Sequence, residues 1–340
     1  MEKEAAQFRV YSSEDHNPIT RALHLRSKMR KIDLEGVDVV ILGFLPQLIT
    51  GPCIKKIAKA YKKNGNIVRI DNKENVVKKP DIVAEMFLSL YDTVVQDRHI
   101  FRDGGMFAAL LKRMDGKTIE AADLVVTDTK ANADYLAKLY GASREKFETL
   151  YLEADRKIYY GISSLEEDYP ENETDNRNNE KTSKDAVVAR SVLYFGTGLP
   201  LQGTDIVLEA FNIADKEISN QSDNNVRFTY VGSLGKIPKE EIKKAQLSDR
   251  IELIDWLPQA RLARKVALAD ICIAGHFNPD IEKANRTIPG KAYIYEAMNK
   301  KMILGDTAAN HEIFAEDYRH IFVERGDPQK LAETIIRLLQ

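Results

Sequence analysis

The sequence predicts an α/β protein with two doubly wound parallel sheets, and three observations support this fold class. Apolar runs such as VDVVILGF (37–44) and DICIAG (270–275) are continuous, which is typical of strands buried on both faces. Patterns of amphipathic helices alternate with such runs along most of the chain. The length of 340 residues exceeds what one core usually serves, so we expect two domains.

A polar stretch separates the two predicted domains. Residues 163–185 read SSLEEDYPENETDNRNNEKTSKD, which offers few side chains to a core and is typical of a linker or a disordered segment. The sequence therefore predicts a shortened N-terminal domain over residues 1–162 and a C-terminal domain over residues 186–340.

The first domain is expected to start with a basic helix over 18–31, because Pro18 suits a first helical turn. The elements predicted after it are a strand (37–44), a helix (54–63), a strand (66–70), an apolar stretch (81–98), a helix (106–121), a strand (124–129), a helix (131–140) and a strand (147–152). Helix 54–63 has one apolar face and five lysines around the rest. This pattern indicates either peripheral contact with an anionic membrane or a solvated helix packed on the sheet.

The second domain repeats the alternation of strands and helices. Its predicted elements are strands at 191–196, 227–232, within 250–258, at 270–275 and at 302–306, with helices at 204–218, 238–247, 259–268, from 291 onward and at 327–339. The loop TGLPLQG (197–203) joins the first strand to its helix, and its glycines allow backbone N–H groups to approach a ligand.

Composition narrows the range of partners and compartments. The formal net charge is -2, so charge gives no argument for nucleic acid as a partner. Cys53 and Cys272 lie far apart in apolar sequence, which is typical of buried thiols in a reducing compartment. No signal peptide or transmembrane run is recognisable, so we expect a cytoplasmic protein. A location at the inner face of the membrane is compatible with this expectation.

The stretch EKANRTIPGK (282–291) is the strongest candidate site. Two of its cations, Arg286 and Lys291, flank a Pro-Gly pair that can open a helix, so both charges and free N–H groups would meet at one point. The stretch leaves the carboxyl end of strand 270–275, the edge where doubly wound sheets bind ligands. It therefore favours a diphosphate ligand, and the alternative is a surface loop with two solvated cations.

Acidic side chains in the apolar stretch 81–98 form a second candidate site. Glu85, Asp92 and Asp97, with Arg98 beside them, would need partners if they were buried among Phe87, Leu88 and Val94. They either line a cleft or pair with one another at the surface. The six histidines have no spaced partners that suggest a metal site or a catalytic triad.

Several motifs in a fixed order resemble the group-one retaining glycosyltransferases of GT-B fold, in particular a subset whose loop reads IP-x-K. They are FGTGLPLQGTDIVLEAF, YVGS, IELIDWLPQ, ADICIAG, EKANRTIPGK, GDTAANHEIF and GDPQKLAETI, with looser likeness in the first half. The resemblance implies two Rossmann-like domains facing across a cleft. The second would hold a nucleotide-diphosphate sugar, and the first would meet a glycan, lipid-linked or protein acceptor, as in polysaccharide biosynthesis.

The resemblance also implies roles for individual residues. Arg286 and Lys291 would stabilise the departing diphosphate, with no metal and no cofactor. The residues expected to bind the donor are Gly198, Gln202, Gly203, Leu257, Glu296, Thr307 and Ala308. The last two would act through free N–H groups at a helix start, and the acceptor cleft would include Glu85, Asp92, Asp97 and Arg98.

Two departures from the family pattern leave a second interpretation open. Ile294 stands where members usually carry a Glu that holds the ribose, and Glu296 replaces it only if the local register shifts. Leu45, Pro46 and Gln47 stand where a Gly-His pair is common. The sequence therefore predicts an active glycosyltransferase or, alternatively, a catalytically inactive glycosyltransferase-like subunit that binds a partner. A sugar-nucleotide epimerase is disfavoured, because the acid and histidine set for that chemistry is not evident.

Overall fold

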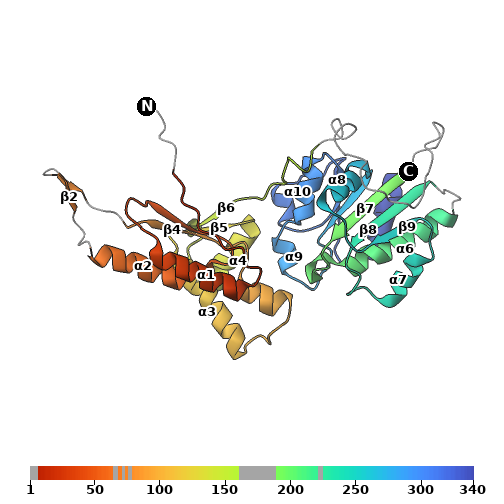
Figure 1. Cartoon of the computed structure of the whole chain (residues 1–340). Helices are drawn as coiled ribbons and strands as arrows, with labels where there is room; N and C mark the ends of the chain where they lie inside the picture. The colour runs from red at the N-terminus through yellow and green to blue at the C-terminus, as the bar shows by residue number, and fades with distance from the viewer. Residues whose placement is uncertain (1–6, 64–67, 71–72, 76–78, 161–188, 221–224) are drawn as a thin grey trace. The chain divides into compact units, whose positions relative to one another are not determined.

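The computed structural model describes residues 7–63, 68–70, 73–75, 79–160, 189–220 and 225–340. The chain divides into two compact units (Figure 1). Unit 1 contains Met1–Asp128 and Ala133–Leu150, and unit 2 contains Thr129–Asn132 and Tyr151–Gln340. The predicted linker at 163–185 lies outside the described residues, so the predicted domain limits at 162 and 186 stay predictions.

Unit 1 contains a sheet of four parallel strands in the order β1-β4-β5-β6. The strands are β1 (Val39–Leu42), β4 (Asp81–Glu85), β5 (Leu124–Thr127) and β6 (Phe147–Thr149). Alternate strand residues, including Ile82, Ala84 and Val125, are buried in one core, as expected for side chains that point to one face of a sheet. The predicted strand at 66–70 instead contributes β2 (Val68–Ile70), which pairs in antiparallel fashion with β3 (Lys73–Asn75).

The helices of unit 1 pack against that core. They are α1 (Pro18–Lys31), α2 (Thr50–Lys63), α3 (Met106–Ala121) and α4 (Lys130–Tyr140), of which the first three residues of α4 belong to unit 2. Each successive strand of this sheet, from β1 to β6, is added on the same side of the one before it. Because the connections between parallel strands are right-handed, the helices in these connections lie on the same face of the sheet. The stretch predicted at 81–98 forms β4 and then a short π-helix, Asp92–Asp97.

Unit 2 contains six parallel strands in the order β12-β11-β10-β7-β8-β9. They are β7 (Arg190–Gly196), β8 (Val226–Gly232), β9 (Ile251–Ile254), β10 (Ile271–Gly275), β11 (Lys301–Gly305) and β12 (His320–Val323). Numbered along the chain, the order is 6-5-4-1-2-3, the arrangement of doubly wound nucleotide-binding folds. The predicted parallel α/β architecture is confirmed, and the direction of winding reverses between β7 and β10.

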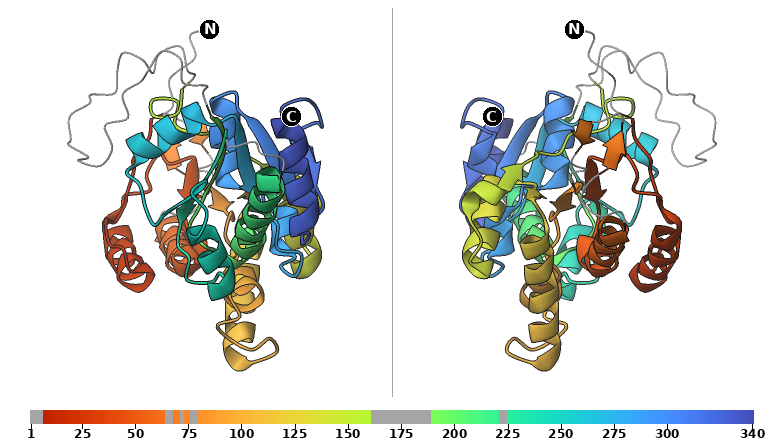
Figure 2. Two further views of the ribbon diagram at one scale, coloured as in Figure 1. Left: turned by 90° about the vertical axis from the view of Figure 1, so that its right-hand side faces the viewer. Right: turned by 90° about the vertical axis from the view of Figure 1, so that its left-hand side faces the viewer.

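Helices cover both faces of the unit 2 sheet. One core joins the sheet to α6 (Thr204–Asn220), α7 (Lys239–Gln246) and α11 (Pro328–Leu339), and Figure 2 shows α6 (green) and α11 (dark blue) side by side. The opposite core joins it to α8 (Gln259–Leu268) and α10 (Gly290–Ala297). This two-sided cover follows from winding outward in both directions from β7.

Two further findings concern the cysteines and the apolar content of the helices. Both cysteines are free and buried, as predicted, and burial raises the pKa of Cys53 to about 11. Among the described helices, none has the length and apolar content needed to cross a bilayer.

Candidate functional site

The loop between β7 and α6 forms the first wall of the candidate site. Gly198 and Gly203 have positive φ angles of 73° and 62°, a region that glycine enters without strain. A Cβ atom at Gly203 would lie 2.8 Å from the main-chain nitrogen of Asn278, so glycine is also required by packing. Gln202 is buried, and its Oε1 accepts a hydrogen bond of 3.1 Å from the N–H of Gly198. The predicted donor residues Gly198, Gln202 and Gly203 thus form one braced loop at the carboxyl end of β7.

The stretch 282–291 forms the second wall. It follows β10 as the four-residue helix α9 (Lys283–Arg286) and then opens α10, whose N-cap is Pro289. Lys291 is the second residue of α10, close to the helix start that the Pro-Gly pair predicted. Because β7 and β10 are neighbours, both walls meet where the winding reverses.

Lys291 is buried at this meeting point. Its side chain is 5% exposed, and its Nζ has no hydrogen-bond partner among the described residues. The ammonium lies over the ring of Tyr194 on β7, 4.6 Å from the ring centroid. Removal from water lowers the pKa of Lys291 to about 7, because desolvation penalises the charged form. A buried cation without a counter-charge is costly, so the site is prepared for an anion.

Arg286 is also buried, at 8% exposure, but it is held by other groups of unit 2. Its Nη1 donates to Oδ1 of Asn132 at 3.3 Å, and its carbonyl accepts a 2.5 Å hydrogen bond from Oγ1 of Thr129. The structure thus places both predicted cations on the connection between β10 and β11. Arg286 is held by Asn132 and Thr129, whereas Lys291 has no hydrogen-bond partner within the ranges that the structure describes.

Two further groups of the site were missed by the sequence analysis. His276 follows β10 directly, is buried, and has an Nδ1 without a partner in the described residues. Burial and then the charges of Lys291 and Lys283 lower the pKa of His276 to about 3, so its imidazole is neutral. Lys283, on α9, is 8% exposed. Both residues could have been found from their place in the sequence, since both lie on the segment that follows the carboxyl end of the predicted strand 270–275.

Residues 189–340 match the model of a family described as Glycosyl transferases group 1. Structural comparison finds HepE of Anabaena, solved with UDP and glucose, at a TM-score of 0.59 and 12% identity, covering 94% of this chain and 72% of that one. Sucrose-phosphate synthase of Thermosynechococcus elongatus gives 0.58 and 13%, covering 94% and 67%. The trehalose-6-phosphate synthase OtsA gives 0.57 and 10%, covering 94% and 68%. A comparison with curated protein sequences finds no match.

These similarities and the two parallel sheets show a GT-B fold with two Rossmann-like units, as the sequence predicted. The family match lies within unit 2, which contains the candidate site described above.

The other predicted donor residues are not all at this site. Glu296 lies at the far end of α10, where it accepts hydrogen bonds from Arg319 (3.2 Å) and His320 (2.8 Å). Desolvation by burial, the largest single cause, would raise the pKa of Glu296. The hydrogen bonds and charges of His320 and Arg319 together outweigh it and hold the pKa of Glu296 below its usual value. His320 begins β12, so this cluster marks the amino edge of the sheet, opposite to Lys291. Ile294 packs against the core beside α10.

Ala308 differs from the prediction in its backbone N–H group. The N–H of Ala308 donates to Oδ1 of Asn285 at 3.1 Å, and Oγ1 of Thr307 accepts from the N–H of Asn310. Only a three-residue 3-10 helix follows, Asn310–Glu312. The expected free N–H group of Ala308 is therefore engaged by α9. Leu257 packs against the same core as α8 and α10.

The predicted acceptor residues belong to unit 1 and differ in exposure. Asp92 and Asp97 are buried in the π-helix, whereas Arg98 at its end is exposed. Glu85 ends β4 and accepts a weak hydrogen bond from the N–H of Phe44 at 3.4 Å.

The most buried carboxylate of unit 1, Asp115, was not predicted. It is fully buried in α3 and accepts hydrogen bonds from Gln47 (2.8 Å), Ser89 (2.7 Å) and the hydroxyl of Tyr140 (3.1 Å). The N–H groups of Leu90 and Tyr91 donate to it as well. Burial raises the pKa of Asp115, and these hydrogen bonds oppose the shift. The carboxylate therefore fixes the turn after β4 onto α3.

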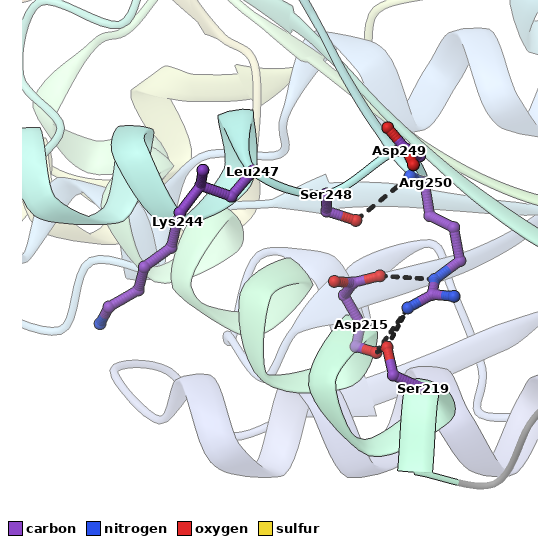
Figure 3. A pocket seen from close by; sticks show the side chains of 7 residues that line it. All are labelled: Asp215, Ser219, Lys244, Leu247, Ser248, Asp249 and Arg250. Atoms are coloured by element: carbon purple, nitrogen blue, oxygen red, sulfur yellow. Dashed lines mark hydrogen bonds and ion pairs between the residues drawn. The ribbon is translucent and has the colours of Figure 1, made fainter.

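A hollow of about 330 Å³ elsewhere in unit 2 is a structural feature rather than a candidate site (Figure 3). Arg250 crosses it, donating from Nε to Oδ1 of Asp215 at 2.6 Å and from Nη2 to Ser219. Arg250 precedes the first residue of β9 and so lies at the amino edge of the sheet. Its charge is already balanced there by Asp215.

Proposed function

We propose that this protein is a glycosyltransferase that moves a sugar from a nucleotide-diphosphate donor to an acceptor, with retention and without a metal. The observation that carries the proposal is the buried ammonium of Lys291 at the reversal point of the unit 2 sheet, whose Nζ has no hydrogen-bond partner in the described part of the chain. A diphosphate would supply the missing counter-charge. The family match over the same residues supports this assignment.

The chemistry needs electrostatic stabilisation more than a protein nucleophile. As the bond from the sugar to the phosphate loosens, the sugar approaches an oxocarbenium-like state and the departing diphosphate gains charge. Lys291 in a site removed from water stabilises that charge strongly, and Arg286 contributes from α9. The acceptor hydroxyl passes its proton to the departing phosphate, so no separate general base is required. Two fixed cations take the electrostatic role that a metal has elsewhere.

The remaining residues of the site orient the donor. The braced loop at Gly198 and Gly203 allows the phosphates or sugar to approach the backbone, and Gln202 keeps the loop in place through its bond to the N–H of Gly198. Neutral His276 adds a group that can exchange a hydrogen bond with the donor without adding charge. We do not assign Glu296 a contact with the ribose of the donor, because Arg319 and His320 hold it at the end of α10 that is remote from Lys291.

The structural relatives suggest which donor nucleotide to test first, and the chemistry of the transfer defines which acceptors are suitable. HepE was solved with UDP and glucose and with UDP-glucose, so UDP is the first nucleotide to test. A glycan, a lipid-linked sugar or a protein would each offer the acceptor hydroxyl.

Calorimetry with UDP, GDP and ADP tests the donor site. We expect one nucleotide to bind to the full-length protein and the Lys291→Met variant to lose at least tenfold in affinity. Lys239→Met removes an exposed lysine of the same unit and should bind like the wild type. Absence of binding by any of the three nucleotides, or equal binding by the two variants, would contradict the proposal.

Turnover separates the enzyme from the inactive subunit. Ile294 in place of the usual Glu favours the subunit, which would bind a nucleotide but release no sugar from it. We expect slow hydrolysis of the matching nucleotide sugar, unchanged by a chelator and abolished by Lys291→Met. Nucleotide binding without hydrolysis or transfer would favour the inactive subunit.

A further inference from the structure

The tip of α3 in unit 1 exposes large apolar side chains. Met106, Phe107 and Leu110 on the helix are 80%, 54% and 52% exposed, and Ile100 in the loop before it is 58% exposed. The views in Figures 1 and 2 show this end of α3, in orange to gold, projecting beyond the rest of the unit's helices. Apolar side chains gathered on a projecting tip need an explanation, since exposed apolar patches mark interaction surfaces.

The tip is an ordered feature held by specific contacts. Asp103 accepts hydrogen bonds from the hydroxyl of Tyr91 (2.9 Å) and from the N–H of Gly104 (2.8 Å), which fix the loop. The rings of Phe101 and Phe107 stack with centroids 5.0 Å apart and planes inclined by 19°. The two rings are thereby held in place although both remain exposed.

The outer face of α3 changes from apolar to basic along its length. Met106, Leu110, Arg113 and Lys117 follow one another at helical spacing, so they share one face of the helix. With a rise of about 1.5 Å per residue, Arg113 lies about 10 Å and Lys117 about 16 Å from Met106 along the axis. The inward face of the helix is formed by Ala108, Asp115, Thr118 and Ile119 instead.

The loop before α3 adds two cations, and it also exposes one acid, Asp103. Arg98 and Arg102 are exposed in the loop before α3. A hollow of about 570 Å³ opens beside the helix, lined by Ala109, Lys112, Arg113, Gly116, Lys117, Glu120 and Tyr140. Three of these seven side chains are cations and one, Glu120, is an acid, so the hollow suits phosphate groups.

We propose that this surface, from Arg98 to Lys117, docks unit 1 on an anionic lipid bilayer. The apolar tip would enter the boundary between headgroups and acyl chains, which reaches about 5–10 Å deep for interfacial helices. Arg113 and Lys117 then lie at the level of the lipid phosphates. A protein partner fits this surface less well, because a narrow convex tip offers little of the roughly 800 Å² that each side of a stable interface buries.

The proposal places membrane contact on α3 rather than on the lysine-rich helix α2. Lys55 and Lys59 of α2 are also exposed, but Ile57 of that helix is buried in the core. Among the α2 side chains of residues 50–60, Ile54 is the one large apolar side chain that is exposed. Over residues 50–60, the α2 surface thus carries positive charge and one exposed large apolar side chain, whereas the α3 surface carries a cluster of exposed large apolar side chains. This difference makes α2 a matched control for α3.

Vesicle sedimentation with the full chain tests the proposal. We expect binding to vesicles of phosphatidylcholine with about 30% phosphatidylglycerol, weakening with salt, and little binding to pure phosphatidylcholine. Phe107→Ser with Leu110→Ser should lower the affinity at least about tenfold, and Arg113→Ser with Lys117→Ser by about tenfold or more. Lys55→Ser with Lys59→Ser should bind within about twofold of the wild type. Thermal melts serve as the folding control for each variant and do not depend on nucleotide binding.

A fluorescence measurement locates the contact. Trp256 is the one tryptophan of the sequence, so Trp256→Phe with Phe107→Trp gives a single reporter at the tip. Its emission should shift to the blue with anionic vesicles. No vesicle binding by the wild type, an unshifted reporter in vesicle-bound protein, or a loss confined to the α2 variant would each overturn the proposal, whether or not a nucleotide binds in unit 2.

Discussion

The low pKa of Lys291 predicts that nucleotide binding takes up a proton. In the free protein burial lowers that pKa to about 7, whereas beside a bound diphosphate the charged form is favoured and the pKa rises. At pH 8 about nine tenths of the free side chains are neutral, and at pH 6 about one tenth are. Binding should therefore take up about 0.9 proton at pH 8 and about 0.1 at pH 6.

Titration calorimetry in buffers that differ in ionisation enthalpy measures this uptake. The terminal phosphate of the nucleotide titrates near pH 6, so the comparison at pH 8 is the informative one. Lys291→Met should lose the uptake at pH 8 together with most of its affinity. Uptake below about 0.2 proton at pH 8 in a wild-type protein that binds the nucleotide would refute the reasoning.

The same pKa predicts how the stability of the free protein depends on pH. An unfolded lysine titrates near 10.5, so between pH 7 and 10.5 the unfolded chain holds more protons than the folded chain. The free energy of unfolding should then rise with pH in this window, by about 1.4 kcal/mol per unit from this group. Thermal melts of wild type and Lys291→Met at pH 7 and pH 9 isolate the contribution. Equal pH dependence in the two proteins would contradict a low pKa at Lys291.

Three further substitutions test other parts of the structure. Gly203→Ala should destabilise the fold by about 1–3 kcal/mol and abolish nucleotide binding, because alanine is unfavourable at a positive φ and its Cβ would lie 2.8 Å from the nitrogen of Asn278. Denaturation measures the loss of stability, and calorimetry measures the loss of binding. Asp115→Ala should destabilise the fold by about 3–5 kcal/mol, because it leaves several buried donors unpaired; a smaller loss than about 1 kcal/mol in urea melts would contradict the buried network. Arg250→Met should lower the free energy of unfolding by about 1–3 kcal/mol, since Asp215 loses its partner, and should leave nucleotide affinity unchanged.

The existence of the strands and their parallel direction were predictable, because both follow from local patterns in the sequence. Continuous apolar runs such as 191–196 and 270–275 can be buried only in a parallel sheet with cover on both faces. The site at 282–291 followed from the same logic, since ligands bind at the carboxyl edge of such sheets. The start of α10 was predictable from Pro289 and Gly290 because proline favours the first turn of a helix.

The side chains that the prediction misplaced depend on partners distant in sequence. Glu296 was assigned near the donor, but Arg319 and His320 hold it at the opposite edge of the sheet, and neither partner can be foreseen from α10 alone. Asp115 reads as one more charged residue of a helix. Its inward position was visible only in its spacing from Ala108 and Ile119, at intervals of seven and four residues, and its donors lie on the loops after β1 and β4 and on α4.

The charges around Lys291 explain why the site needs a ligand that stays anionic. Burial, and then the charges of Lys291 and Lys283, disfavour protonation of His276, so its imidazole remains neutral and adds no charge to the site. In the free protein, the buried ammonium of Lys291 lowers the free energy of unfolding. A bound diphosphate removes this destabilisation by supplying the counter-charge. A ligand present at 100 times its dissociation constant stabilises the folded state by about 2.7 kcal/mol. The bound protein should therefore lose most of the pH dependence that Lys291 gives to the free protein, because its ammonium then stays charged in both the folded and the unfolded state over this range.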